Sequence, residues 1–306
     1  YLGLDLRGGV HFLLQVDMQG AVSKQIDATA GDLRTLLRQK KVGHGGVTRE
    51  GDKLALRLRS DADRKQAQNV IRDARDDLEF SERTEGNDFW LIATLTAPAR
   101  KTIQEEAIKQ NIVTLHNRVN ELGVAEPVIQ QQGLDRIVVQ LPGVQDVSKA
   151  KDLIGRTATL QVRMVAEGAD PMNPPPGVDV FPEVRDGQEV PHAVKKQVVL
   201  TGDRFVKASA TFDNDQRPAV SVDLDSAGGL IMRDTTREHL HKQMAIILFE
   251  KGRGEAISVA TIQGEFSNKF QITGNFSAED TTRLAILIRS GSLAAPMDII
   301  EERVIG

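Results

Sequence analysis

The run Gly3-Leu4-Asp5-Leu6-Arg7-Gly8-Gly9 leads directly into the alternating stretch Val10-His11-Phe12-Leu13-Leu14-Gln15-Val16. Two adjacent glycines before such a stretch indicate a strand whose first residues turn sharply or lie against another backbone. Asp5 and Arg7 are two residues apart, so in an extended chain they point to the same face. No Gly-x-Gly-x-x-Gly pattern is present and no helix follows directly, so this is not a dinucleotide-binding loop. We expect a structural role for Gly3, Asp5, Arg7, Gly8 and Gly9. In this role the run closes the first strand against a strand at residues 297–304.

The composition is that of an ordinary globular chain and argues against several classes of function. The 306 residues suffice for two or three domains, and 40% of them are hydrophobic and 27% charged. The net charge is -4 with both signs interspersed, which argues against nucleic-acid binding. The absence of cysteine excludes disulfide and thiolate sites, and one Trp and one Tyr make an aromatic sugar-binding platform improbable. No segment reaches the roughly 18 apolar residues of a membrane-spanning helix.

Hydrophobic periodicity predicts an α+β fold with two consecutive β-α-β-β-α-β units. The first unit has its expected strands and helices at residues 9–17, 18–41, 47–49, 54–58, 62–78 and around Phe80. The second has them at residues 89–95, 98–122, 128–132, 136–141, 147–154 and 157–165. This order is typical of ferredoxin-like folds, so we predict that residues 1–165 form a base of two tandem ferredoxin-like units.

Residues 170–191 interrupt this pattern, because prolines in their first part, residues 170–177, cannot donate to a regular backbone ladder. Later strands are expected near residues 197–200, 219–224, 244–250 and 256–263, with a helix opening near Ser226. We predict that residues 166–265 form an inserted α+β head and that residues 266–306 return to the base. Gly168 and Gly264 supply backbone freedom at the expected crossings, so they are candidate hinges.

The candidate catalytic and metal-binding patterns all have simpler interpretations. His239 and His241 are two residues apart and would point to different faces of a helix, which disfavours joint metal ligation. The acidic triplet at Asp213 lacks the glycine and glutamate that an EF-hand loop needs at its sixth and twelfth positions. Gly228-Gly229 has no following Lys-Ser/Thr and is not a phosphate loop. No catalytic residue, cofactor or metal site is therefore predicted, and the chain is not expected to be an enzyme.

An apolar strand in the predicted head is the best candidate for a binding surface. Residues 244–249 are apolar on both faces, so one face can pack on the head helix while the other needs a second cover. Either the head itself buries both faces or a partner covers one of them. The residues expected to contact such a partner are Val199, Leu200, Ile246 and Leu248.

Several blocks of the sequence resemble, in the same order, the SecD family of protein-translocation accessory subunits. The first block is the double-glycine run at residues 3–9. Others are Leu122-Gly123-Val124-Ala125-Glu126-Pro127, residues 132–143, residues 199–202, residues 224–229, residues 287–293 and the closing residues 301–306. On this resemblance the chain is similar to the large first periplasmic domain of that family, with an extra α-β unit at residues 18–96 and without the family's membrane helices.

The resemblance implies a role in export rather than in catalysis. It suggests a periplasmic domain of a bacterial inner-membrane protein whose head holds unfolded preprotein while proton flow through absent membrane helices supplies the force. The implied partners of the full-length protein are SecF and the SecY-SecE-SecG channel, and no nucleic acid is implied. The alternative is a porter-like domain of a resistance-nodulation-division efflux transporter, which also contains β-α-β-β-α-β units. A hydrolase or metalloenzyme is a further rival, and bound Zn²⁺ or Ca²⁺ would distinguish it.

Overall fold

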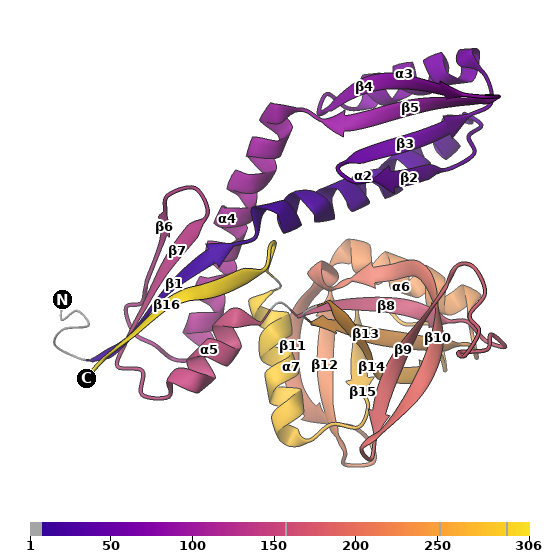
Figure 1. Cartoon of the computed structure of the whole chain (residues 1–306). Coiled ribbons are helices and arrows are strands. Elements are labelled where there is room, and N and C mark those ends of the chain that lie inside the picture. Colours follow the sequence, from indigo (N-terminus) through magenta and orange to yellow (C-terminus); the bar gives the residue numbers. More distant parts are fainter. Residues whose placement is uncertain (1–7, 157, 251, 292) are drawn as a thin grey trace.

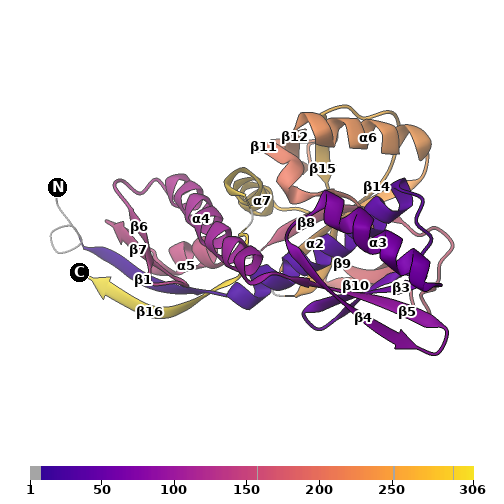
Figure 2. The ribbon, with the colours of Figure 1, turned by 90° about the horizontal axis from the view of Figure 1, so that it is seen from above.

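The computed structural model describes residues 8–156, 158–250, 252–291 and 293–306 and has mixed α/β architecture with four antiparallel sheets (Figure 1). A four-stranded base lies beside a head of two sheets, and a third body built from residues 18–96 projects away from the base on two helices. Figure 2 shows the same separation of the bodies from above. Among the described helices, none is both long enough and apolar enough to cross a membrane.

The base is one sheet covered on one face by two helices. Its strands are β1 (Gly9–Val16), β6 (Val128–Gln132), β7 (Arg136–Pro142) and β16 (Met297–Ile305), in the order β16-β1-β7-β6. Its helices are α4 (Ala97–Glu121) and α5 (Val147–Gly155). Along the chain these elements follow the order β-α-β-β-α-β, which is interrupted once after β1 and once after α5.

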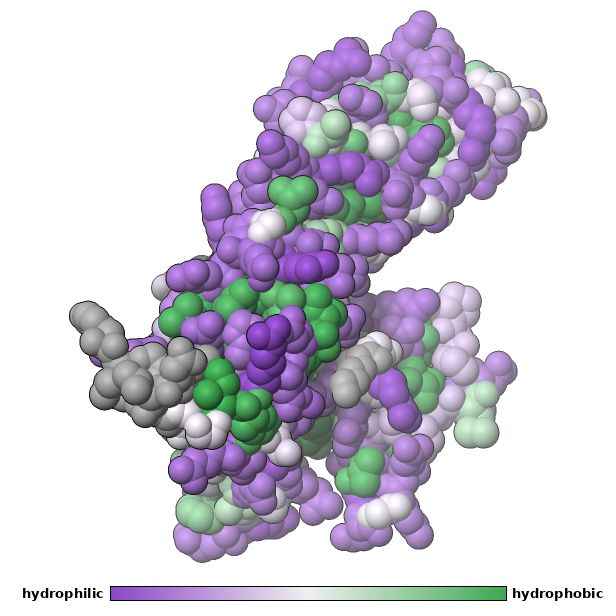
Figure 3. All heavy atoms as spheres, turned by 60° about the vertical axis from the view of Figure 1, so that its left-hand side comes forward, coloured by the Kyte–Doolittle hydropathy of each residue, from purple (hydrophilic) through white to green (hydrophobic). Residues whose placement is uncertain are grey.

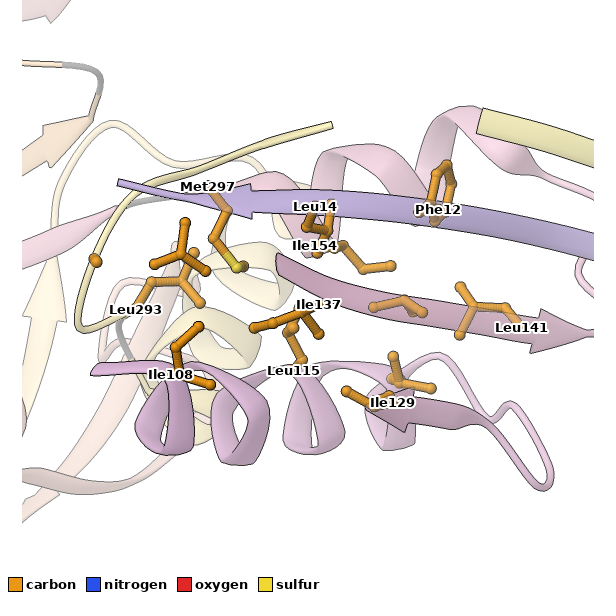
Figure 4. Close-up of a cluster of buried hydrophobic side chains, with 14 of the residues drawn as sticks. Phe12, Leu14, Ile108, Leu115, Ile129, Ile137, Leu141, Ile154, Leu293 and Met297 are labelled. Atoms are coloured by element: carbon orange, nitrogen blue, oxygen red, sulfur yellow. The ribbon is translucent and has the colours of Figure 1, made fainter. Parts of the chain in front are cut away.

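The base core forms where alternate strand residues meet the apolar stripe of α4. Phe12 and Leu14 of β1, Ile137 of β7 and Leu115 of α4 all point into one cluster (Figure 4). Each of these four side chains is at most 1% exposed. Alternation on the strands and helical spacing on α4 therefore direct their apolar residues toward the same interior.

The projecting body follows the order α-β-β-α-β-β. Its elements are α2 (Met18–Gln39), β2 (Val47–Glu50), β3 (Lys53–Leu58), α3 (Asp61–Ala74), β4 (Leu78–Glu85) and β5 (Asp88–Leu95). Its sheet has the order β2-β3-β5-β4 and its own apolar core, which includes Leu33, Leu56 and Leu91. Helix α2 leads out of β1 and packs along α4, so this body is joined to the base through a helix pair.

The head combines a five-stranded and a three-stranded sheet. The larger has the order β14-β13-β8-β10-β9, with β8 (Thr159–Val165), β9 (Val178–Arg185), β10 (Gln188–Thr201), β13 (Gln243–Glu250) and β14 (Arg253–Thr261). The smaller has the order β11-β12-β15, with β11 (Phe205–Phe212), β12 (Pro218–Leu224) and β15 (Lys269–Thr273). The short 3-10 helix η1 (Gly202–Arg204) joins β10 to β11, α6 (Ser226–Glu238) follows β12, and α7 (Ala278–Ser290) packs on β11 and β12.

Strand pairing differs from the expected tandem arrangement. Strand β1 pairs with β7 and β16, whereas the hairpin at residues 47–58 pairs with β5 in the projecting body. Strand β8 and strand β15 both pair within the sheets of the head. The head therefore begins before residue 166 and ends after residue 265, the bounds that the sequence predicted for it. These pairs do not form the two tandem ferredoxin-like units that were predicted. Local periodicity identifies a strand, but it does not identify the partner to which that strand hydrogen-bonds.

The segment expected to be irregular contains a hairpin instead. Strands β9 and β10 pair with Pro182 opposite Pro191. Proline is compatible with this position because β9 is an edge strand and β10 pairs with β8 only from Val194 onward.

Candidate functional site

The four predicted preprotein contacts lie mostly inside the head. Leu200 and Ile246 are 2% and 5% exposed and belong to the core between the two head sheets, against which the half-buried Val199 and Leu248 pack. The neighbouring Ile247 belongs to a second cluster on the opposite face of β13. The head thus covers both faces of this apolar strand, and of the four predicted contacts Leu248 is the one that reaches a cavity.

That cavity has a volume of about 290 Å³ and lies between the larger head sheet and α7. Its apolar lining consists of Val184, Leu248, Ala256, Ile257, Phe276, Leu284 and Leu287. Its polar lining consists of Arg156, Glu183, Glu255, Asn275, Asp280 and Arg283. The larger head sheet and α7 form separate layers. The cavity lies beside Leu248, where the side chains of these two layers do not fill the space between them.

Charged pairs surround this cavity. Arg156 holds Glu250 through two hydrogen bonds of 2.9 and 3.3 Å. The buried Glu183 is bonded by His192 at 2.5 Å and by Arg185 at 2.9 Å. Partial burial, reinforced by repulsion from Glu189 and Glu250, raises the pKa of Glu255.

Such a cavity is suited to binding an apolar side chain of an extended polypeptide. Its apolar residues can remove that side chain from water, while the charged groups of the lining can face the polar backbone beside it. Within the described residues, no group of three or more His, Cys, Asp or Glu side chains is placed to hold a metal ion. On the face shown in Figure 3 the surface is mainly hydrophilic, and its apolar side chains gather over the base and the adjoining helices.

The described part of the double-glycine motif lies where a structural role requires glycine. Gly8 has φ +67, and a Cβ added to it would lie 2.9 Å from the carbonyl oxygen of Ile305. Its own carbonyl accepts a hydrogen bond from Gly143, and Gly9 pairs with Ile305. Close approach of β1 to the C-terminal strand is therefore present as expected. Gly3, Asp5 and Arg7 lie outside the described residues.

The hinge candidates do not lie between the base and the head. Gly168 follows β8 and Gly264 lies between β14 and β15, so both are within the head. The chain instead passes from base to head between α5 and β8, and from head to base between α7 and β16. Nothing lies within 4 Å of a Cβ added to either glycine, and Gly168 has φ +77.

Sequence reasoning missed two buried polar residues on α4. Asn111 and Arg118 are both 0% exposed and lie in the same helical stripe as Leu115. Their spacing of seven residues, with an apolar residue between them, was the available signal, because polar residues in a buried stripe need specific partners.

Comparison with known proteins places every part of the chain among protein translocase subunits. Residues 179–295 match the family model described as the SecDF P1 head subdomain, residues 108–167 match the N-terminal part of the SecDF P1 domain, and residues 1–19 match the SecD/SecF GG motif. The protein translocase subunits SecD of Salmonella choleraesuis and Escherichia coli K12 are 40% and 39% identical over all of this chain. The chain spans about half, 52%, of the length of each.

Two solved structures resemble the fold. A crystal structure of SecDF in a super-membrane-facing form covers 99% of this chain and 31% of its own, with a TM-score of 0.57 at 23% identity. A second structure, from work on SecDF as a membrane component that enhances protein export, covers 64% of this chain and 92% of its own, with a TM-score of 0.51 at 29% identity.

Proposed function

The chain belongs to the SecD family of protein translocase subunits, as the periplasmic P1 region, and on this basis we propose that it binds unfolded preprotein during export. The membership concerns about half the length of the relatives, so the activity of the whole protein is part of the proposal. We propose a periplasmic location on a bacterial inner-membrane protein. The full-length protein would act with SecF and the SecY-SecE-SecG channel and would use the proton-motive force through membrane helices.

The head cavity beside Leu248 is the observation that carries this proposal. A preprotein in transit is unfolded and exposes apolar side chains, and a cavity of about 290 Å³ whose lining includes Leu248, Phe276 and Leu284 can accept one of them without sequence specificity. Burial of one leucine-sized side chain contributes about 2–3 kcal/mol. Ordering of the flexible chain offsets much of this gain, so affinity is modest, as release of a moving substrate requires.

A head that binds preprotein with different affinity in two orientations would bias the movement of the preprotein outward. A ligand shifts such an equilibrium only by its differential affinity for the two states. The force would come from outside this chain, and the head would supply the contact that couples force to the preprotein.

Site-specific photo-crosslinking in cells that produce the full-length protein tests the proposal. The crosslinking residue replaces Val184 or Asn275 at the cavity, and in matched controls it replaces Asp215 in the head or Gln130 in the base. All four positions are exposed, so the substitutions leave the cores intact. We expect a stalled preprotein to be captured from Val184 and Asn275 and to disappear from the adducts when export is completed. Equal or stronger capture from Asp215 and Gln130 would show that the binding site lies elsewhere.

A further inference from the structure

Arg118 is a fully buried cation whose hydrogen bonds to the described residues go to backbone carbonyls, and its Nε has no partner among those residues. One guanidinium nitrogen donates to the carbonyls of Leu153 and Ile154, both at 3.1 Å, and to that of Arg156 at 2.5 Å. The other donates to the carbonyl of Gly291 at 3.4 Å. Among the described residues no carboxylate forms an ion pair with Arg118, so backbone dipoles balance its charge.

These carbonyls belong to the ends of two helices from different bodies. Leu153 and Ile154 lie in the last turn of α5 in the base, whereas Gly291 is the C-cap of α7 in the head. The carboxyl end of a helix carries partial negative charge and unpaired carbonyls, and it binds a cation favourably. Burial and the nearby Arg156 lower the pKa of Arg118 to about 10, so the side chain stays charged at neutral pH.

Helix α4 also contacts the second base–head connection, at Ala294 and Ala295. Asn111 donates to the carbonyl of Ala295 at 3.0 Å and accepts from the backbone N–H groups of Ala294 at 2.7 Å and Ala295 at 3.3 Å. At the end of α4, Glu121 pairs with Arg289 of α7 through bonds of 3.0 and 2.8 Å. Helix α4 therefore contacts both connections and the head helix through polar groups.

We propose that Arg118 is a positioning residue that sets the orientation of the head relative to the base by holding the carboxyl ends of α5 and α7 together. Both crossings leave from these two helix ends, so a rotation of the head about them changes the distance from Arg118 to the Gly291 carbonyl, whereas Leu153 and Ile154 stay with Arg118 in the base. The planar guanidinium can bond several carbonyls in fixed directions, which a point charge cannot do. Asn111 secures the C-terminal connection beyond α7. The inference concerns the geometry used by the proposed function, and its test needs no preprotein, so its failure would leave that function unaffected.

The absence of cysteine makes the test direct, because two introduced cysteines are the only ones in the protein. Spin labels at Gln130 in the base and Ser209 in the head, both exposed, report the base–head distance by pulsed electron resonance in the 306-residue chain. Arg118→Met keeps an unbranched, flexible side chain that packs in a buried site but removes all its donors. Arg64→Met is the matched control, because Arg64 is 6% exposed and bonded to Asp61 in the projecting body, away from the connections.

We expect Arg118→Met to broaden or shift the distance distribution while Arg64→Met leaves it as in the unaltered protein. Circular dichroism and thermal unfolding identify which variants are folded. A folded Arg118→Met protein with an unchanged distribution would overturn the proposal, even if its stability were reduced. If Arg118→Met does not fold, Arg118→Lys replaces it, since a single ammonium cannot reach both helix ends. A folded Lys variant must then broaden the distribution, and an unchanged one overturns the proposal equally.

Discussion

Replacement of Gly8 by alanine tests whether the double-glycine motif closes β1 against β16. Two separate costs are expected at this position. The first is conformational, because φ +67 lies in the left-handed region and costs an L-residue about 1–2 kcal/mol. The second is steric, because the new Cβ would lie 2.9 Å from the Ile305 carbonyl oxygen, whereas relaxed carbon–oxygen contacts lie at about 3.3–3.6 Å. Strand β16 would have to move, at a cost of about 1–3 kcal/mol typical of overpacking.

Gly133 offers a matched control in the same sheet. It turns the chain between β6 and β7 with φ +66, and nothing lies within 4 Å of an added Cβ. Gly133→Ala therefore carries the conformational cost without the steric one. The free energy of unfolding of the base should fall by about 1–3 kcal/mol more in Gly8→Ala than in Gly133→Ala.

The assay has to report on the base itself. The single tryptophan, Trp90, lies in β5 of the projecting body, so its fluorescence follows a different unit. Hydrogen exchange of peptides covering β1 and β16, measured across a urea series, reports the base directly. Equal destabilisation by the two alanine variants would refute the close-approach argument, since the steric term would then be absent.

Two further predictions concern α4. Arg289 holds the pKa of Glu121 below its usual range, so the stabilisation by this half-exposed pair, up to about 1 kcal/mol, is present above the unfolded pKa and is lost as pH falls through the lower folded value. Glu121→Gln should therefore lower the melting temperature at pH 7, and the difference from the wild type should shrink as pH falls through the lowered folded pKa and the wild-type carboxyl becomes protonated; a difference of unchanged size across this titration would contradict the ion-pair origin. Leu115→Ala, at a site 0% exposed, should reduce the free energy of unfolding by about 2–5 kcal/mol, whereas Val113→Ala, at a site 52% exposed on the same helix, should change it by less than about 0.5 kcal/mol in urea titrations. Similar losses in the two variants would contradict the assigned helix face.

The starts and ends of several helices could be predicted from the sequence because the signals for them are local. Ser60 accepts from the N–H of Asp63, Asp146 from that of Lys149, and Ser277 and Asp280 form a reciprocal capping box. Gly291 ends α7 with φ +81, as its position after the apolar stripe predicted. Each of these features depends on groups within about four residues, so the sequence contains all the information needed.

The candidate site was harder to predict because burial depends on distant segments. The sequence showed that residues 244–249 are apolar on both faces, but Ile246 could be core or binding surface until its neighbours were known. The structure places the head core against one face and Ala256 with its neighbours against the other. Only the space beside Leu248 stays open, and it is bounded by α7, more than 30 positions further along the chain. No local pattern reports such a gap.

Local patterns in the sequence predicted most of the helices and strands, although not β9 or β11, together with the family resemblance and the need for glycine at residues 8 and 9. Periodicity, capping and turn chemistry act over a few residues, and motif order is a property of the chain alone. The closure of β1 against β16 was predicted, but the tertiary structure was needed to show that β1 also pairs with β7, from the middle of the chain, and not with the nearby hairpin. It also decided that Arg118 would be a buried cation rather than a surface one. Pairing and desolvation are set by contacts between segments that are distant in the sequence, and their free energy exists only when those segments have come together.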